Sequence, residues 1–99
     1  MGLDAAEVDS KHYKVEFENE QVRVLRVKYG PKEVSEMHEH PNAVGVFLTA
    51  GGARFHYEDG TSEDISWEVG DAGWFPATKH KPENLGDGPA ELLVVELKS

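Results

Sequence analysis

The residues with the clearest chemical potential are two histidines separated by one residue, His38 and His40. Alternate side chains of a β-strand point to the same face, so a strand here would aim both imidazoles at one place. Neutral imidazole is a common ligand of zinc, iron, copper and nickel. The pair therefore forms half of a metal site, although in a chain with five histidines the spacing alone also fits two solvated side chains at a strand end.

A third histidine, His80, follows a segment rich in turn-forming residues. Five residues separate Gly70 from Pro76, and three residues separate His80 from Asn84. Together with the pair at positions 38 and 40, this arrangement resembles the cupin family, whose two short motifs combine glycine, histidine, proline and asparagine at these spacings.

The resemblance extends from about residue 20 to about residue 98. Gly30 and Gly51 stand at the glycines that open and close the first motif, although the gap between Gly30 and the first histidine is two residues longer than usual. Thr78 stands where the second motif usually has a glycine. The patterns at 38–41, 48–51 and 95–98 are similar to those of short stand-alone cupins of the β-alanine-degradation-protein type.

The resemblance implies an all-β fold, the antiparallel jelly-roll barrel, with His38, His40 and His80 as metal ligands. It also reveals a departure from the family pattern. The carboxylate ligand of the family belongs at position 44 or 45, where this chain has Val44 and Gly45, and neither side chain can bind a metal. The usual centre of three histidines and one glutamate is therefore excluded.

Three outcomes follow from the missing carboxylate. The three histidines could hold a metal alone, and an ion with three neutral ligands would keep its full double charge and polarise bound water or substrate. A nearby acid could instead replace the ligand or support a histidine; the candidates are Glu36, Glu39, Glu83 and Glu96, although Glu39 should point away by strand alternation. The third outcome is a metal-free polar pocket.

The function expected from this site is the binding of a small organic molecule, with a divalent transition metal (Zn, Ni, Fe, Mn or Cu) as the cofactor. The protein would then be a metal-dependent enzyme of small-molecule metabolism. The alternatives are a metal-free ligand-binding or sensor module and a barrel with a vestigial pocket. The sequence has no Gly-x-Ser-x-Gly elbow and no phosphate-binding glycine loop, so it identifies no catalytic residue.

The remaining sequence predicts the strands that must position these histidines. Turn-forming residues recur about every 8 to 15 residues, which is typical of a sandwich or barrel and not of alternating strands and helices. The expected strands are 13–18, 21–29, 43–50, 53–57, 63–69, 74–77 and 91–98, with a hairpin turn at 58–61. No helix is expected beyond one short turn within residues 4–9.

Strand alternation also predicts which side chains lie inside. Tyr13, Val15 and Phe17 should share one face of the first strand. If Phe55 faces the core, as its strand pattern favours, His56 is exposed.

The chain length of 99 residues predicts one domain. Residues 1–12 are expected to form a flexible N-terminal lead-in, with His12 on the surface, and residues 13–99 the cupin domain. Trp74 and Phe75 are expected in the barrel wall.

Composition limits the partners. The net charge of −9 disfavours binding to nucleic acid or to an anionic membrane surface, and it favours solubility. The chain has no cysteine, no secretory signal and no apolar run near the roughly 20 residues that span a bilayer, which predicts a cytoplasmic protein. The strands at 21–29 and 91–98 are apolar on both sides, which predicts a homodimer.

Overall fold

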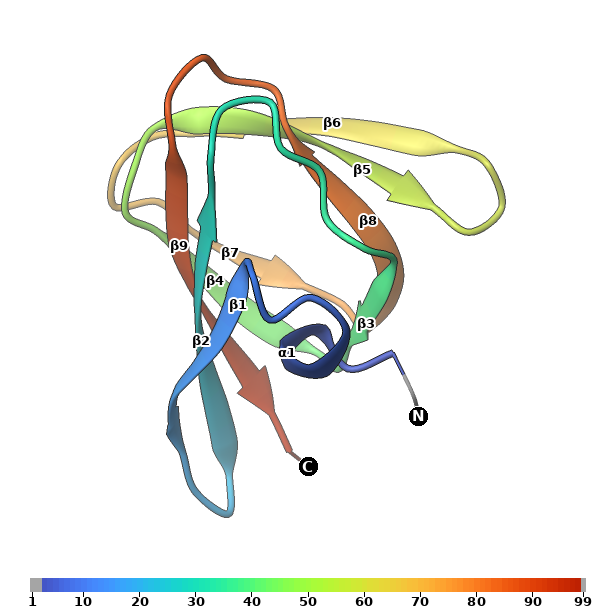
Figure 1. The fold of residues 1–99 in the computed structure, drawn as a ribbon. Helices are drawn as coiled ribbons and strands as arrows, with labels where there is room; N and C mark the ends of the chain where they lie inside the picture. The colour runs from blue at the N-terminus through green and yellow to red at the C-terminus, as the bar shows by residue number, and fades with distance from the viewer. Residues whose placement is uncertain (1–2, 99) are drawn as a thin grey trace.

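Two antiparallel sheets face each other in the computed structural model, which describes residues 3–98 (Figure 1). In spatial order, the first sheet contains Tyr13–Glu18 (β1), Val22–Tyr29 (β2), Ala90–Leu97 (β9), Ala43–Phe47 (β4) and Ala72–Phe75 (β7). The second contains His38–His40 (β3), Thr78–Asn84 (β8), Gly51–Tyr57 (β5) and Ser62–Trp67 (β6). The predicted all-β jelly-roll fold is confirmed.

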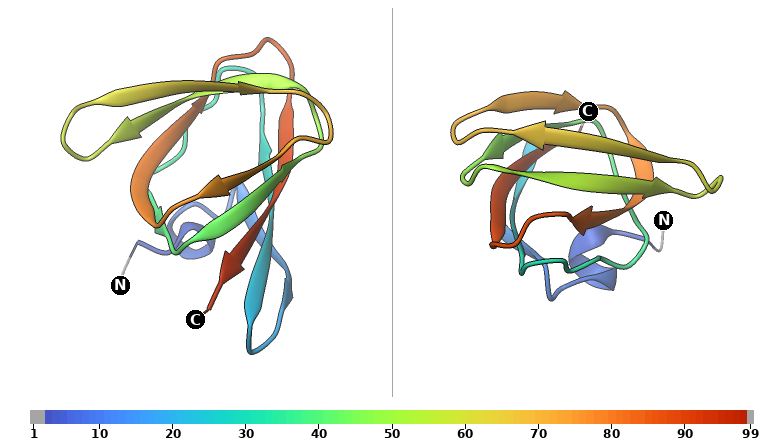
Figure 2. Two further views of the ribbon diagram at one scale, coloured as in Figure 1. Left: turned by 180° about the vertical axis from the view of Figure 1, so that it is seen from behind. Right: turned by 90° about the horizontal axis from the view of Figure 1, so that it is seen from above.

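The two sheets curve around a common interior (Figure 2). Strands β2 and β9 pair along their whole length, and their alternate residues supply much of the core. Leu25 is 0% exposed and Val27 is 1% exposed, which places both on the inner face. The long apolar strands predicted at 21–29 and 91–98 therefore lie next to each other in the first sheet.

The hairpin predicted at 58–61 connects β5 and β6, and Gly60 adopts a φ of 90°, a conformation that favours glycine. Strand β8 was not predicted from the sequence, because its alternating lysine, histidine, proline and glutamate residues lack an obvious strand pattern. Asn84 ends this strand, and its side-chain amide donates to the carbonyls of Gly30 and Gly88. It therefore ties the two motifs together, as a structural residue does.

Strand β1 departs from the predicted alternation. Its register with β2 shifts between Val15 and Phe17, which marks a β-bulge. The extra residue moves Phe17 to the outer face of the sheet, where it is 53% exposed. The prediction that Phe17 shares a face with Tyr13 is therefore wrong.

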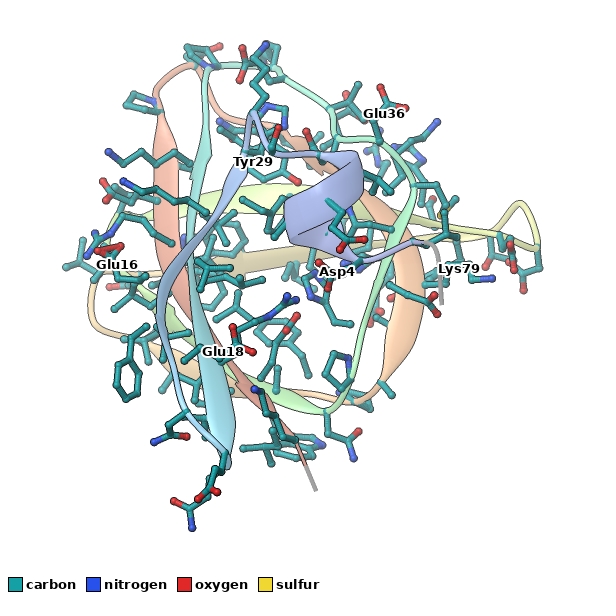
Figure 3. The ribbon with its side chains drawn as sticks, turned by 60° about the horizontal axis from the view of Figure 1, so that its bottom comes forward. Asp4, Glu16, Glu18, Tyr29, Glu36 and Lys79 are labelled. Atoms are coloured by element: carbon teal, nitrogen blue, oxygen red, sulfur yellow. The ribbon has the colours of Figure 1, made fainter. Side chains whose placement is uncertain are left out.

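The N-terminal segment packs against the barrel. It contains the short helix Ala5–Val8 (α1), and Ala5 is 0% exposed. Asp4 lies at the start of this helix (Figure 3), and its backbone forms an isolated parallel β-bridge with that of Glu39 in β3. The predicted division of the chain at residue 13 stays a prediction. The helix before residue 13 nevertheless packs against the same core as the strands. No helix among residues 3–98 is long and apolar enough to cross a membrane.

His12 lies in this segment and is 5% exposed, so the prediction of a surface histidine is wrong. Its Nδ1 lies 2.8 Å from a carboxylate oxygen of Asp9, and its Nε2 lies 3.0 Å from Glu33. The ring stacks on Tyr29 at a centroid distance of 4.2 Å. We call His12, Asp9 and Glu33 the acidic histidine cluster; its two carboxylates compensate the burial of the ring.

Candidate metal centre

The pairing of β3 with β8 brings the three predicted histidines together. His38 lies directly opposite His80, and His40 is two residues further along the same face of β3. The ring centroids are 4.7 to 5.4 Å apart, and ligand nitrogens of all three rings lie within 4.8 Å of one another. His38 is 0% exposed and His80 is 5% exposed. The spacing of a small metal site is therefore present in a buried place, and we call these residues the three-histidine cluster.

Hydrogen bonds orient two of the rings. The Nδ1 of His38 lies 2.8 Å from the carbonyl oxygen of Glu36, and the Nδ1 of His40 lies 2.6 Å from a carboxylate oxygen of Glu96. A carbonyl or carboxylate oxygen only accepts, so Nδ1 carries the hydrogen in both rings and Nε2 keeps its lone pair. This is the arrangement in which a histidine is ready to bind a metal.

Several ring nitrogens have no partner among the described residues. These are Nε2 of His38 and both nitrogens of His80, and all three atoms are buried. A buried polar atom without a hydrogen bond costs about 1–3 kcal/mol, so such atoms call for an explanation. A metal ion at the centre of the cluster would supply a partner to Nε2 of His38 and to one nitrogen of His80, and the residues fit it.

Burial also sets the protonation state of the cluster. Removal from water, with a smaller effect of the neighbouring His40, lowers the pKa of His38 to about 4. The same burial, together with the other two histidines, lowers the pKa of His80 to about 2. Both rings are neutral at physiological pH, and neutral imidazole is the form that binds metals.

Glu96 supports His40 from behind. Its carboxylate is 2% exposed, and while one oxygen accepts from His40, the other accepts from Nε of Arg23 at 2.9 Å. Arg23 also donates to the carboxylate of Asp4, and these contacts, the hydrogen bond to Asp4 first, raise the pKa of Arg23 above its ordinary value. A chain of charged hydrogen bonds thus runs from the N-terminal segment to a ring of the cluster.

The structure places all four acids that the sequence offers as replacement ligands. Glu39 stands between the two histidines of β3, so strand alternation turns its side chain to the other face. Glu96 orients a histidine, Glu83 binds His56 at 2.9 Å, and the side chain of Glu36 is exposed while its backbone carbonyl holds His38. The group of metal-ligating side chains among residues 3–98 contains histidines alone. The geometry therefore supports one of the roles considered for an acid: Glu96 orients a histidine and does not replace the missing ligand.

Val44 and Gly45 occupy the two positions at which the family's carboxylate ligand is expected. Val44 pairs with Trp74 on the outer face of the first sheet, whereas Gly45 faces the interior. A Cβ atom at Gly45 would lie 2.4 Å from the ring of Phe75. The aromatic ring therefore fills the space next to position 45 that a longer side chain would need. The prediction for the barrel wall is right for Phe75 and wrong for Trp74, which alternation turns outward to 56% exposure.

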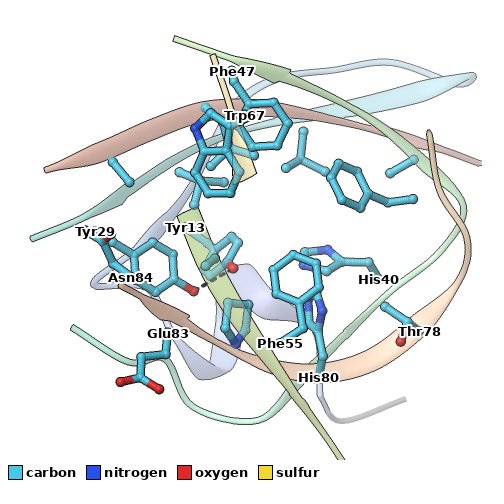
Figure 4. A pocket seen from close by; sticks show the side chains of 18 residues that line it. Tyr13, Tyr29, His40, Phe47, Phe55, Trp67, Thr78, His80, Glu83 and Asn84 are labelled. Atoms are coloured by element: carbon cyan, nitrogen blue, oxygen red, sulfur yellow. Dashed lines mark hydrogen bonds between the residues drawn. The ribbon is translucent and has the colours of Figure 1, made fainter. Parts of the chain in front are cut away.

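A cavity of about 70 Å³ adjoins the cluster (Figure 4). His40 and His80 contribute to its wall, and Tyr13 covers the side of the cluster with its ring 4.6 Å from that of His38. Phe55 lies over His80 at 4.7 Å, so the prediction that Phe55 faces inward is confirmed. The rest of the lining is mainly apolar and consists of Val27, Tyr29, Ala43, Phe47, Ala53, Trp67, Phe75, Thr78, Pro82, Glu83, Asn84, Ala90, Leu92 and Val94.

Sequence reasoning did not assign Tyr13 or Arg23 to the site. Tyr13 reaches the cluster because β1 lies at the edge of the first sheet, and Arg23 because it pairs with Glu96 across β2 and β9. The inward position of Tyr13 was visible in the alternation, but its contact with the histidines depends on how the two sheets meet.

Comparison with known proteins agrees with this architecture. The family model of the cupin domain matches residues 25–96. A cupin domain protein from Bordetella pertussis Tohama I has a TM-score of 0.80 and 24% identity, over 88% of this chain and 92% of its own. A protein with a double-stranded β-helix domain from Klebsiella pneumoniae has a TM-score of 0.68 and 22% identity, over 86% and 74%. No curated protein matches the sequence at a significant level.

A more distant similarity involves an enzyme with a metal. Oxalate decarboxylase from Bacillus subtilis, a protein with Mn(II) centres, has a TM-score of 0.59 and 25% identity over 77% of this chain. The aligned part is 21% of that enzyme's chain. The likeness therefore concerns only a part of a much longer protein.

Proposed function

The chain belongs to the cupin domain family, and from that premise we propose that it binds a divalent transition metal through His38, His40 and His80. The observation that carries the proposal is the set of buried ring nitrogens that no described protein group satisfies. The neutral state of His38 and His80 and the hydrogen bonds that present Nε2 of His38 and His40 support it. Zn, Ni, Fe, Mn and Cu all suit nitrogen ligands of this kind.

We propose further that the metal centre serves a small organic ligand in the adjoining cavity, as part of a metal-dependent enzyme of small-molecule metabolism. When bound, a divalent metal with three neutral ligands supplies a full double charge that polarises an oxygen or sulfur atom. The protein's own contributions are distinct. Glu96 and the Glu36 carbonyl fix two rings, and the apolar lining excludes water from the ligand. The sequence pattern supports a place among the cupins of the β-alanine-degradation-protein type.

Metal content tests the proposal directly. Protein purified without a histidine tag should contain close to one equivalent of metal, and His38→Ala should lose it. His56→Ala is the matched control, because His56 lies outside the cluster and binds Glu83. A wild-type protein that takes up none of the five metals after loading would contradict the proposal and favour the metal-free binding module, which the missing carboxylate also suits.

We also propose that the protein forms a homodimer through the outer face of the first sheet. One row of apolar side chains crosses all five strands in register on this face, namely Phe17, Val24, Val95, Val44 and Trp74. Phe17 and Trp74 at its two ends are each more than half exposed. An apolar row of this length is characteristic of an interaction surface, and identical rows of two copies match about a two-fold axis.

Charges of both signs border the row, since Arg26 binds Glu16 at 2.8 Å and Glu91 at 2.7 Å, which suits self-association. Sedimentation velocity should therefore show a dimer for the wild type and a monomer for Val95→Glu. Val69→Glu, in an exposed turn, should remain dimeric. A monomeric wild type would overturn this proposal and leave the metal site untouched.

A further inference from the structure

We infer that the ligand of the cavity has a small hydrocarbon body, one oxygen or sulfur atom that binds the metal, and no second charged group. The inference rests on the proposed metal site and concerns what that site selects. It follows from the chemistry of the wall, from the commitments of the nearby charged and polar groups, and from the size of the cavity.

Aromatic rings form the wall opposite the histidines. Phe47 stacks on Trp67 at 4.3 Å and meets Phe75 at 6.1 Å, and Phe75 meets Phe55 at 6.2 Å. Phe55 in turn packs on His80 at 4.7 Å, so the apolar wall begins directly beside the cluster. A molecule bound at the cluster would therefore have hydrocarbon contacts over its remaining surface.

No lysine or arginine contributes to the lining described for residues 3–98. The arginines of the barrel are paired elsewhere: Arg23 with Glu96 and Asp4, Arg26 with acids on the outer face, and Arg54 with Asp64. A second carboxylate or a phosphate on the ligand would lose its hydration without gaining a cation. Such burial of an unpaired charge is strongly unfavourable.

An ammonium group on the ligand would also lack a partner in the cavity. The acid of the lining, Glu83, accepts from His56, and strand alternation places both side chains on the outer face of the second sheet. The hydroxyls of Tyr13 and Tyr29 bind each other at 2.7 Å, and the side-chain amide of Asn84 is held by backbone groups. These polar groups already have partners, so polar recognition is left mainly to the three-histidine cluster, Thr78 and the indole N–H of Trp67, a buried donor without a partner among the described residues. This single neutral donor does not balance the charge of a carboxylate or phosphate, and it cannot accept from an ammonium group.

The volume limits the body of the ligand. The cavity measures about 70 Å³, which is smaller than an apolar cavity of about 150 Å³ that accommodates benzene. Phe75 contributes to this limit because its ring stands against Gly45, where the family's carboxylate would otherwise reach inward. The space therefore suits a body of a few carbon atoms.

Three thiols with the same metal-binding atom and different tails test the inference on the full chain loaded with Co²⁺. They are 1-propanethiol, 3-sulfanylpropanoate and 2-aminoethanethiol, whose tails are apolar, anionic and cationic. Thiolate binding is followed by the sulfur-to-cobalt charge-transfer band, after the cobalt spectrum has established loading. We expect 1-propanethiol to bind at least about ten times more tightly than either charged thiol, because only the charged tails lose hydration without compensation.

The outcomes distinguish failure of the metal site from failure of the ligand class alone. Absence of the cobalt spectrum overturns the metal site and the ligand class with it. A loaded protein that binds a charged thiol as tightly as 1-propanethiol, or that binds none of the three, overturns the ligand class alone.

Neighbouring residues of β7 provide a matched pair of variants. Phe75→Ala enlarges the cavity and should shift the preference from 1-propanethiol toward 1-pentanethiol by about tenfold. Trp74→Ala removes a side chain that points to the outer face and should leave the preference unchanged. An unchanged preference in a folded, cobalt-loaded Phe75→Ala protein would contradict the assigned position of the ligand body.

Discussion

Buried histidines occur in two clusters of this small domain, and their ring nitrogens have opposite surroundings. His12 and His80 are each 5% exposed. In the acidic histidine cluster, both nitrogens of His12 face carboxylate oxygens, those of Asp9 and Glu33. In the three-histidine cluster, neither nitrogen of His80 has a partner among the described residues.

The difference distinguishes a structural histidine from one available to a ligand. Both ring nitrogens of His12 are occupied by carboxylate oxygens, so neither is available to a metal. His80 is held neutral by burial and keeps a lone pair. Burial of a histidine alone is therefore uninformative; the partners of its nitrogens decide its role.

The largest effect is expected from removing the central histidine of each cluster in turn. His12→Ala leaves the Asp9 carboxylate, 6% exposed, without its imidazole partner and should cost about 3–5 kcal/mol of unfolding free energy. His80→Ala removes an unsatisfied group and should cost clearly less in metal-free protein, yet abolish metal binding. Urea denaturation and metal analysis of both variants test the contrast, and a reversal of the two stabilities would refute it.

The next effect concerns the one carboxylate that touches the three-histidine cluster. Glu96→Gln replaces the acceptor that holds Nδ1 of His40 and should weaken metal affinity about 10- to 100-fold. Competition with a chromophoric chelator measures the change. Glu91→Gln is the control, since Glu91 lies on the same strand and binds Arg26 on the outer face. Equal metal affinities of the two variants would show that Glu96 does not contribute to metal binding.

Acid should affect the acidic histidine cluster through Glu33. The backbone N–H of Gly30, then Lys11 and His12, lower the pKa of Glu33 from 4.5 to about 2. A carboxylate with a depressed pKa in the folded state stabilises it above pH 4.5, and this stabilisation is lost as the pH falls toward about 2. The loss of stability between pH 6 and pH 3 should therefore be smaller in Glu33→Gln than in the wild type.

Urea midpoints at the two pH values measure this loss. Glu36→Gln, which alters an exposed side chain a few residues away, should follow the wild type. The assigned role of Glu33 fails if its variant loses as much stability as the other two proteins.

The smallest effect is expected where the two clusters approach each other. Tyr29 stacks on His12, its hydroxyl binds that of Tyr13, and Tyr13 contacts His38. Tyr13→Phe removes one hydrogen bond and should cost about 1 kcal/mol. Metal content should stay the same, because the ring that covers the cluster remains. A loss of metal would show that the hydroxyl pair contributes to the centre.

Much of this arrangement could be predicted from local sequence. The spacing of His38 and His40 fixes their common face, and the Asp-Gly turn at 59–60 fixes the hairpin. The place of Phe17 could not be predicted, because a bulge reverses its face, nor could strand β8, whose residues are polar where they pair. The burial of His12 depends on Glu33, which is 21 residues away in sequence. Contacts across sheets follow from register, which a single sequence does not display.

The chain of hydrogen bonds from Asp4 through Arg23 and Glu96 to His40 has a consequence for the start of the polypeptide. Thermodynamic coupling is reciprocal. If the contact at Asp4 stabilises the metal-binding position of His40, metal binding must stabilise the contact at Asp4. Occupancy of the centre should therefore slow amide hydrogen exchange in helix α1, which lies outside the barrel strands. A fusion or cleavage near Asp4 would in turn lower metal affinity, so the ends chosen for a recombinant protein would influence its metal chemistry.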